Sequence, residues 1–233
     1  YTYQTLKGER TERYHDIVAR KVMPFDAWRE LYGILTDAGV PFVISCYDTP
    51  TIDFCVEIGA AAIKIASNNV HHVPLLRHAA RSGLPVIIDT GRASMSQVAL
   101  AVETLKASGC ASFVINHNPD GHPAPPENHN LNIIGAYRGG FGCPVGLSCH
   151  YVGTEILFAA IGAGYHLLEK PVCPDPLEAD VDSPWAVALA DVPEVIKQVD
   201  ACSVALGRSV RDRLYRDQDN VAIMGLIARA DLV

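Results

Sequence analysis

One unit recurs along the chain and constrains its fold more than any other feature. It is a helical stretch, a glycine, and then a short apolar run that ends in polar residues. It appears as LTDAGVPFVISCYD, VEIGAAAIKIASNN, ARSGLPVIIDTGR, KASGCASFVINHN, GGFGCPVGLSCHY and IGAGYHLLEKPV. The glycine suits the left-handed conformation that ends many helices. The apolar runs are mostly continuous, as in strands of a parallel sheet covered on both faces. Repetition of the unit therefore predicts right-handed β-α-β connections.

Helical periodicity fills the gaps between the strands. Apolar residues recur with a spacing of about 3.6 in PFDAWRELYGILTDAG, SMSQVALAVETLKASG and GTEILFAAIGAG. Ser94 and Ser96 are candidate N-caps. A longer helical stretch, SPWAVALADVPEVIKQVDACSVALG, is expected to break before Pro193.

These elements predict an α/β fold of the (β/α)8 TIM-barrel type. Six strands are expected, YTYQT at the start would be a seventh, and the first strand would be missing from this chain, upstream of Tyr1. An open doubly wound sheet is the alternative, but no glycine-rich phosphate motif follows an early strand. We expect the catalytic barrel over residues 1–207 and a helical extension over 208–233, whose apolar patch could dock on the barrel or on a second subunit.

Polar residues end every expected strand. In a barrel these ends form one ring at the C-terminal face, where barrel enzymes carry out their chemistry. Residues two apart on a strand share a face. The expected convergent set is Ser45, Lys64, Ser67, Asp89, Asn118, Ser148, His150 and Glu169.

Alternation also separates Cys149 from its neighbours. Ser148 and His150 point one way and Cys149 points the other, so His150 is poorly placed to activate Cys149 as a nucleophile. Cys149 is expected to pack against a helix as a small apolar residue. His150 is left as a metal ligand, a general acid/base or a polar rim residue.

Lys64 lies inside the apolar run AAIKIAS, where an ammonium group needs an anionic partner. That partner is either an acid of the barrel, Glu169 or Asp89, or a bound phosphate or carboxylate. Hydroxyl and amide donors at the neighbouring strand ends favour the bound anion.

A long loop rich in proline and asparagine, NHNPDGHPAPPENHNLN, follows one strand at residues 116–132. It is either an ordered surface loop or a lid over the substrate, because long loops at this face of a barrel are often functional.

Composition excludes several classes of protein. The net charge is −7 and no basic run exists, so neither nucleic acid nor an anionic membrane is an expected partner. No apolar run reaches the roughly 18 to 20 residues of a membrane span, and the first residues carry no signal-peptide pattern. The seven scattered cysteines fit reduced thiols in a cytoplasmic protein.

Five motifs in one order resemble the sialic acid synthase family, from about residue 25 to about residue 207. They are KIAS at 64–67, VPLLRHAARSGLPVIIDTG, PAPPENHNLNII, CPVGLSCH, and EK at 169–170. Enzymes of that family join phosphoenolpyruvate to an N-acetylated amino sugar and form a 2-keto-3-deoxy acid. The resemblance implies a barrel fold and a related reaction.

The resemblance also implies roles for individual residues. Lys64, Ser67, Asn118 and Ser148 match positions that hold the phosphate and carboxylate of phosphoenolpyruvate, and Ser45 stands where the family usually has a threonine. Asp182 matches an aspartate that binds the sugar. His150 matches one of two histidines that hold a divalent metal, typically manganese.

The chain departs from the family pattern at several of these positions. The second metal histidine falls at Pro171, a glutamate thought to serve in catalysis falls at Asn69, and the serine of the STG motif is Asp89. The aspartate before the metal histidine is Cys149, and an early phosphate-binding lysine falls at Thr2. The antifreeze-like C-terminal domain is expected to be absent. Asp89 could replace the lost ligand of Mn²⁺ or Mg²⁺, with Glu169 or His122 nearby.

Together these observations predict a divergent carbon–carbon bond-forming synthase, expected to be a homodimer. Its donor would be phosphoenolpyruvate or a similar anion, and its acceptor an aldehyde or aldehydo-sugar. The expected catalytic residues are Asp89, His150 and Glu169, the expected metal ligands are Asp89 and His150, and Asn69 is expected among the substrate-binding residues. The alternatives are a lyase or aldolase, with Asp89 and His150 as acid/base pair or Lys64 as a Schiff-base lysine, and a non-catalytic barrel that binds a ligand or partner.

Overall fold

The computed structural model of the protein describes residues 1–5, 7–174 and 181–208; the predicted extension lies outside them except for its first residue, Arg208. The strands are β1 (Thr2–Thr5), β2 (Gly8–Thr11), β3 (Val43–Cys46), β4 (Ala62–Ile65), β5 (Val86–Asp89), β6 (Phe113–His117), β7 (Val145–Ser148), β8 (Leu167–Glu169), β9 (Val172–Cys173) and β10 (Val187–Ala188). The α-helices are α1 (Tyr14–Ala19), α2 (Phe25–Asp37), α3 (Thr49–Ile58), α4 (Val73–Arg81), α5 (Met95–Ala107), α6 (Ile133–Phe141), α7 (Glu155–Ala163) and α8 (Val192–Leu206). Short 3₁₀ turns are η1 (Ser67–Asn69), η2 (Pro126–Asn128), η3 (Ser183–Trp185) and η4 (Leu189–Asp191).

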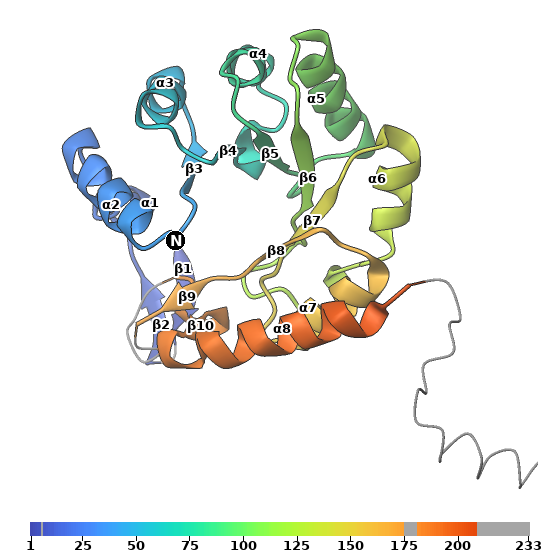
Figure 1. Cartoon of the computed structure of the whole chain (residues 1–233). Helices are drawn as coiled ribbons and strands as arrows, with labels where there is room; N and C mark the ends of the chain where they lie inside the picture. The colour runs from blue at the N-terminus through green and yellow to red at the C-terminus, as the bar shows by residue number, and fades with distance from the viewer. Residues whose placement is uncertain (6, 175–180, 209–233) are drawn as a thin grey trace, which may run out of the picture.

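Six parallel strands form the central sheet, in the sequential order β3-β4-β5-β6-β7-β8. Figure 1 shows these strands curving around a common centre, with the helices arranged outside them. A doubly wound sheet would reverse its strand order at a switch point, and this sheet does not. The α/β barrel class predicted from the sequence is therefore confirmed, with six barrel strands in the described part of the chain.

Local sequence explains where the helices stop and start. The glycines of all six repeated units, at 39, 59, 83, 109, 142 and 164, have positive φ angles. Helix α5 begins with a capping box, in which Ser94 Oγ accepts from the backbone N–H of Gln97 and the Gln97 side chain accepts from that of Ser94. Ser94 is therefore the N-cap, and Ser96 lies inside the first turn.

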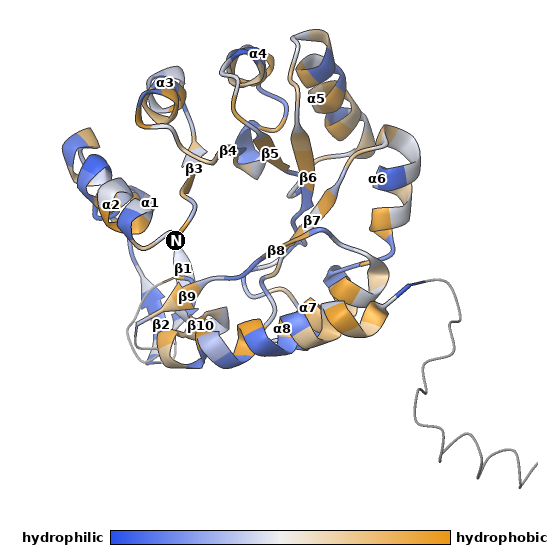
Figure 2. Ribbon diagram, in the orientation of Figure 1, coloured by the Kyte–Doolittle hydropathy of each residue, from blue (hydrophilic) through white to orange (hydrophobic). Residues whose placement is uncertain are grey.

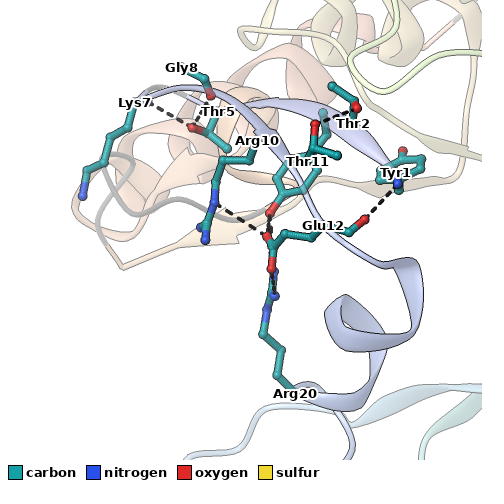
Figure 3. Close-up of polar contacts among 10 residues, drawn as sticks. Tyr1, Thr2, Thr5, Lys7, Gly8, Arg10, Thr11, Glu12 and Arg20 are labelled. Carbon is teal, nitrogen blue, oxygen red and sulfur yellow. Dashed lines mark hydrogen bonds and ion pairs between the residues drawn. The ribbon is translucent and has the colours of Figure 1, made fainter.

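The opening segment corrects one expectation. Strand β1 pairs antiparallel with β2 as a hairpin, instead of joining the parallel sheet as a seventh strand. Figure 3 shows what holds the hairpin: the amino group of Tyr1 donates to the Glu12 backbone oxygen at 2.8 Å, and Arg20 Nη1 donates to the Glu12 side chain at 2.6 Å. The Arg20 bond, followed by the bond that Tyr3 Oη donates to the same carboxylate, lowers the pKa of Glu12 to about 2.

The segment before α8 corrects a second expectation. Residues 183–191, predicted as helix, instead form η3, the short strand β10 and η4, and β10 pairs parallel with β9. Helix α8 begins at Val192, so Pro193 falls in its first turn, where a missing N–H costs no hydrogen bond.

Alternation along the strands separates an apolar outer layer from a polar interior. Ile63 and Ile65 on β4 are fully buried in the hydrophobic core, and Lys64 between them points the other way. Figure 2 shows the apolar faces of the outer helices turned toward the sheet. No helix in the described residues is long and apolar enough to cross a membrane.

Gly146 on β7 leaves room in this interior for side chains of its two neighbouring strands, β6 and β8. A methyl group there would lie 2.5 Å from Asn116 Oδ1 and 3.0 Å from Leu167 Cβ. Asn116 has no exposed surface and cannot move away without breaking its own hydrogen bonds. The side chain of Asn116 thus occupies the space that any larger residue at position 146 would need.

We expect Gly146→Ala to destabilise the protein by about 1–3 kcal/mol, because it overpacks the interior. Urea unfolding measures the change. Gly139→Ala is the matched control: Gly139 lies within α6 with no atom within 4 Å of an added Cβ. It should stabilise by roughly 0.5–1 kcal/mol, the usual gain for glycine to alanine within a helix. Equal effects of the two substitutions would contradict the packing argument.

Candidate active site

A cavity of about 410 Å³ opens at the carboxyl ends of the strands. It is lined by Ser45, Lys64, Ser67, Asp89, Asn118, Ser148, His150, Glu169 and Asp182. The convergent set expected from strand alternation is therefore brought together, and Asp182 joins it from the segment before η3. Asn69, predicted to bind substrate, lies in η1 and is not among the residues that line this cavity.

Lys64 lies at the centre of an ion cluster. Its Nζ lies 2.9 Å from Asp89 Oδ2 and donates to both carboxylate oxygens of Glu169, at 2.5 and 2.7 Å. Asp89 and Glu169, which the sequence analysis gave as alternative partners of Lys64, therefore both bind it. The cluster joins β4 to its neighbour β5 and to β8 on the far side of the sheet.

Asn116 completes the cluster, and its role was missed at the sequence level. Its Nδ2 donates to Asp89 Oδ1 at 2.7 Å and to Glu169 Oε2 at 2.8 Å. The signal was present, because Asn116 lies two residues before Asn118 and so shares its inward face. The outward residue between them, His117, bonds through Nε2 to the backbone oxygen of His129.

The two carboxylates of the cluster share one ammonium group. Burial disfavours the charged form of Lys64, but the attraction of Asp89 and Glu169 outweighs it and raises the Lys64 pKa. The pKa of Asp89 is also raised, chiefly by burial, because its side chain is 5% exposed against 41% for Glu169. Burial thus disfavours the ionised form of Asp89.

His150 is a neutral imidazole in this site. Its Nε2 lies 3.4 Å from Ser148 Oγ, and its buried Nδ1 has no hydrogen-bond partner in the described structure. Burial first, and then the neighbouring His122 and Lys64, lower its pKa to about 3. Cys149 faces away into the hydrophobic core, as predicted, and burial raises its pKa, so it is not an activated nucleophile.

Two aromatic side chains close the cavity beside His150. The ring centroids of His122 and His150 lie 4.2 Å apart. The Trp185 ring centroid lies 5.7 Å from that of His122 and 6.1 Å from that of His150. His122 comes from the long loop after β6, so that loop contributes to the cavity, as the lid hypothesis required. Trp185 was not expected, because the sequence predicted a helix over its segment.

The residues do not fit a divalent metal as their side chains lie. The described residues contain no group of three His, Cys, Asp or Glu side chains that could hold one. Both Asp89 oxygens are already bonded, to Asn116 and Lys64, and the position of the second family histidine is Pro171, which lines the cavity without offering a ligand atom.

Comparison with known proteins agrees with the fold. The model of the NeuB family matches residues 1–211. The N,N'-diacetyllegionaminic acid synthase of Legionella pneumophila is 31% identical over 60% of this chain and 40% of its own length. The human N-acetylneuraminate-9-phosphate synthase is 26% identical over 81% of this chain and 53% of its own.

A solved structure shows the same fold. The crystal structure of N-acetylneuraminic acid synthetase from Leptospira borgpetersenii, in complex with citrate, superimposes with a TM-score of 0.82 at 24% identity, over 92% of this chain and 75% of that one. The chain spans about half the length of the curated relatives it matches.

The buried neutral His150 should make stability depend on pH. Between its folded pKa of about 3 and its ordinary value of 6.5, the unfolded chain binds a proton that the folded chain does not. Stability from this residue is therefore complete above pH 6.5 and is lost as the pH falls toward 3. In this pH window, His150 should make the free energy of unfolding rise by up to about 1.4 kcal/mol per pH unit, and we expect His150→Gln to remove this contribution.

Urea unfolding of wild type and His150→Gln at several pH values between 4 and 7 measures this slope. The control is His15→Gln, a change of an exposed histidine on α1, which should leave the slope unchanged. Identical slopes in wild type and His150→Gln would show that His150 is not held neutral.

Proposed function

Because the chain belongs to the NeuB family, we propose that it serves a synthase that joins phosphoenolpyruvate, or a similar donor, to an aldehyde or aldehydo-sugar. The product would be a 2-keto-3-deoxy acid. The observation that carries the proposal is the gathering of Lys64, Ser67, Asn118 and Ser148 on one cavity at the carboxyl ends of the barrel strands.

The donor fits these residues by chemistry. Serine hydroxyls and the Asn118 amide are neutral donors for phosphate and carboxylate oxygens, and Lys64 adds a positive charge. The charged residues that line the cavity are Lys64, Asp89, Glu169, Lys170 and Asp182. With every one of them ionised, acids outnumber bases, so an anionic donor must be accompanied by a compensating proton. Asp89, with its raised pKa, is the group that supplies this neutralisation.

The proposed reaction uses the three predicted catalytic residues. The C3 carbon of the donor forms a bond to the aldehyde carbon, and the aldehyde oxygen becomes a hydroxyl by taking the proton of Asp89. His150 donates a hydrogen bond from its neutral ring to that oxygen. Glu169 accepts one proton from the water that adds to C2. The C2–O bond to phosphate then breaks while the second proton of that water passes to the leaving phosphate, so C2 becomes a ketone and inorganic phosphate leaves. The proton on Glu169 returns to Asp89 and restores the starting state.

One observation favours the alternative of a ligand-binding barrel without this chemistry. Lys64 already has two carboxylate partners, so a donor must compete with them. The same pairing argues against a Schiff-base aldolase, because a raised pKa keeps the Lys64 amine protonated and non-nucleophilic. An aldolase or lyase that uses Asp89 and His150 as acid and base is the remaining alternative.

Several finer expectations remain predictions. These are ligation of Mn²⁺ or Mg²⁺ by Asp89 and His150, sugar binding by Asp182, contacts of Ser45 and Asn69 with substrate, a homodimer, and a cytoplasmic location. The assay below is therefore run both with manganese and with a chelator.

The central test incubates the protein with phosphoenolpyruvate and a panel of aldehydes, from short hydroxyaldehydes to N-acetylated amino sugars, and measures phosphate release. We expect release that depends on the aldehyde. Ser148→Ala should weaken phosphoenolpyruvate binding about tenfold, the effect of losing one charge-assisted hydrogen bond. Lys64→Gln should weaken it further. Lys106→Gln, an exposed lysine on α5, is the control and should leave binding unchanged. No phosphate release with any aldehyde, together with no donor binding by calorimetry, would falsify the proposal.

Donor binding should also take up a proton at Asp89. The arriving negative charge raises the Asp89 pKa further, so affinity for phosphoenolpyruvate should fall as the pH rises. Calorimetry above pH 7, in buffers with different ionisation enthalpies, counts the protons. Asp89→Asn should abolish the uptake and leave affinity less dependent on pH, whereas Asp53→Asn, an exposed acid on α3, should behave as wild type. The same uptake in Asp89→Asn would remove Asp89 from this role.

A further inference from the structure

A second cavity, of about 450 Å³, opens beside the first. Ser67, Asn118 and His122 line both cavities. A Cβ on Gly91 would overlap the side chain of Ser67, so the loop after β5 lies directly against a residue that the two cavities share. A molecule that reacts in the first cavity and extends across these residues would enter the second.

Among the described residues, one base and one acid with permanent charges line the second cavity, Arg92 and Asp120, and they are paired. Arg92 Nε donates to Asp120 Oδ1 at 2.8 Å, which joins the loop after β5 to the loop after β6. The guanidinium and carboxylate charges cancel. Arg92 and Asp120 together therefore add no net charge to the second cavity.

The loop that carries Asp120 is held in place at two points. Asn128 Nδ2 donates to the backbone oxygen of Asp120 at 2.8 Å. The backbone N–H of Ala124 donates to the backbone oxygen of His150 at 2.9 Å. The position of Asp120 opposite Arg92 is thus set by the loop backbone and not by their ion pair alone.

The lining suits hydroxyl groups. A guanidinium only donates hydrogen bonds and a carboxylate only accepts them, whereas a hydroxyl group does both and can bridge the two. Asn68, His71 and Gln97 add further polar groups around the same space. Because Arg92 and Asp120 are exposed, their ion pair is weak and can open to admit a ligand.

A phosphate group is poorly served by the same lining. Asp120 would repel it and already neutralises Arg92. Helix α5 begins at this cavity, but its capping box uses the backbone N–H groups of Ser94 and Gln97, at 2.9 and 3.3 Å, so they are not free to bind an anion.

We propose that the second cavity is the subsite for the far end of the acceptor, and that the Arg92–Asp120 pair selects a neutral, polyhydroxylated aldehyde over its phosphorylated form. This rests on the proposed function, because an acceptor is required for the subsite to have a use. The specificity lies in Asp120: its carboxylate is what excludes the phosphate.

The test measures binding directly, without donor and without turnover. N-acetylmannosamine and its 6-phosphate are the two probes, titrated by ligand-observed NMR into the whole chain. Wild type should bind the neutral sugar at least tenfold more tightly than its 6-phosphate. Asp120→Asn leaves Arg92 unpaired and should shift this ratio at least tenfold toward the phosphate, mainly by tighter phosphate binding. Arg92→Gln should weaken the neutral sugar and should not gain the phosphate.

Glu194→Gln is the matched control, because it removes the same charge from an exposed ion pair with Lys197 on α8. It should keep the wild-type ratio, which separates a local effect of Asp120 from a change in net charge. A wild-type preference for the phosphate, a ratio within twofold of wild type in Asp120→Asn, or no binding of either sugar at millimolar concentration would each overturn the subsite. If no condensation is detected but Asp120→Asn still shifts the ratio of the two sugar affinities as expected, the proposed reaction is rejected and the subsite stands.

Discussion

The buried ammonium group of Lys64 is the constraint on which the rest of the structure depends. A lysine in the barrel interior requires anionic partners, and it finds them on β5 and on β8. Strands β4 and β8 are not neighbours in the sheet, so their ion pair bridges the inside of the curved sheet. Asn116 on β6 binds the same two carboxylates, and Gly146 on β7 leaves the space in which Asn116 sits. The charge of Lys64 thus links β4 to β5 and β8 directly, Asn116 adds β6 through the same two carboxylates, and β7 contributes the space at Gly146.

This arrangement also sets the chemistry that the cavity can perform. Two carboxylates lie around one ammonium group, and burial raises the pKa of one of them, Asp89. In the reaction that we propose, an anionic donor binds together with a proton on Asp89, and that proton passes to the aldehyde oxygen. His150 contributes as a neutral ring, because burial prevents its protonation.

The loops determine what can reach this site. The loop after β6 brings His122 to both cavities and Asp120 to the second, where Arg92 from the loop after β5 pairs with Asp120. Strand ends and loops therefore divide the work. The barrel strands carry the charged side chains of the interior, Lys64, Asp89 and Glu169. The loops carry the ion pair of the second cavity, Arg92 and Asp120.

The sequence by itself determined the barrel class, the positions of the strands and the inward face of Ser148 and His150, because hydrophobic continuity, glycine caps and strand alternation are local properties. It also supplied nearly all residues of the cavity. Only the tertiary structure decided that Lys64 has both Asp89 and Glu169 as partners, that Asn116 joins them, and that Asn69 is not among the residues that line the cavity. In the structure, YTYQT forms part of a hairpin and not a barrel strand. The segment around Trp185, predicted as helix, forms short 3₁₀ turns and a strand. These outcomes depend on which of several equally polar side chains meet across the barrel, and local patterns carry no information about distances between strands that are far apart in the chain.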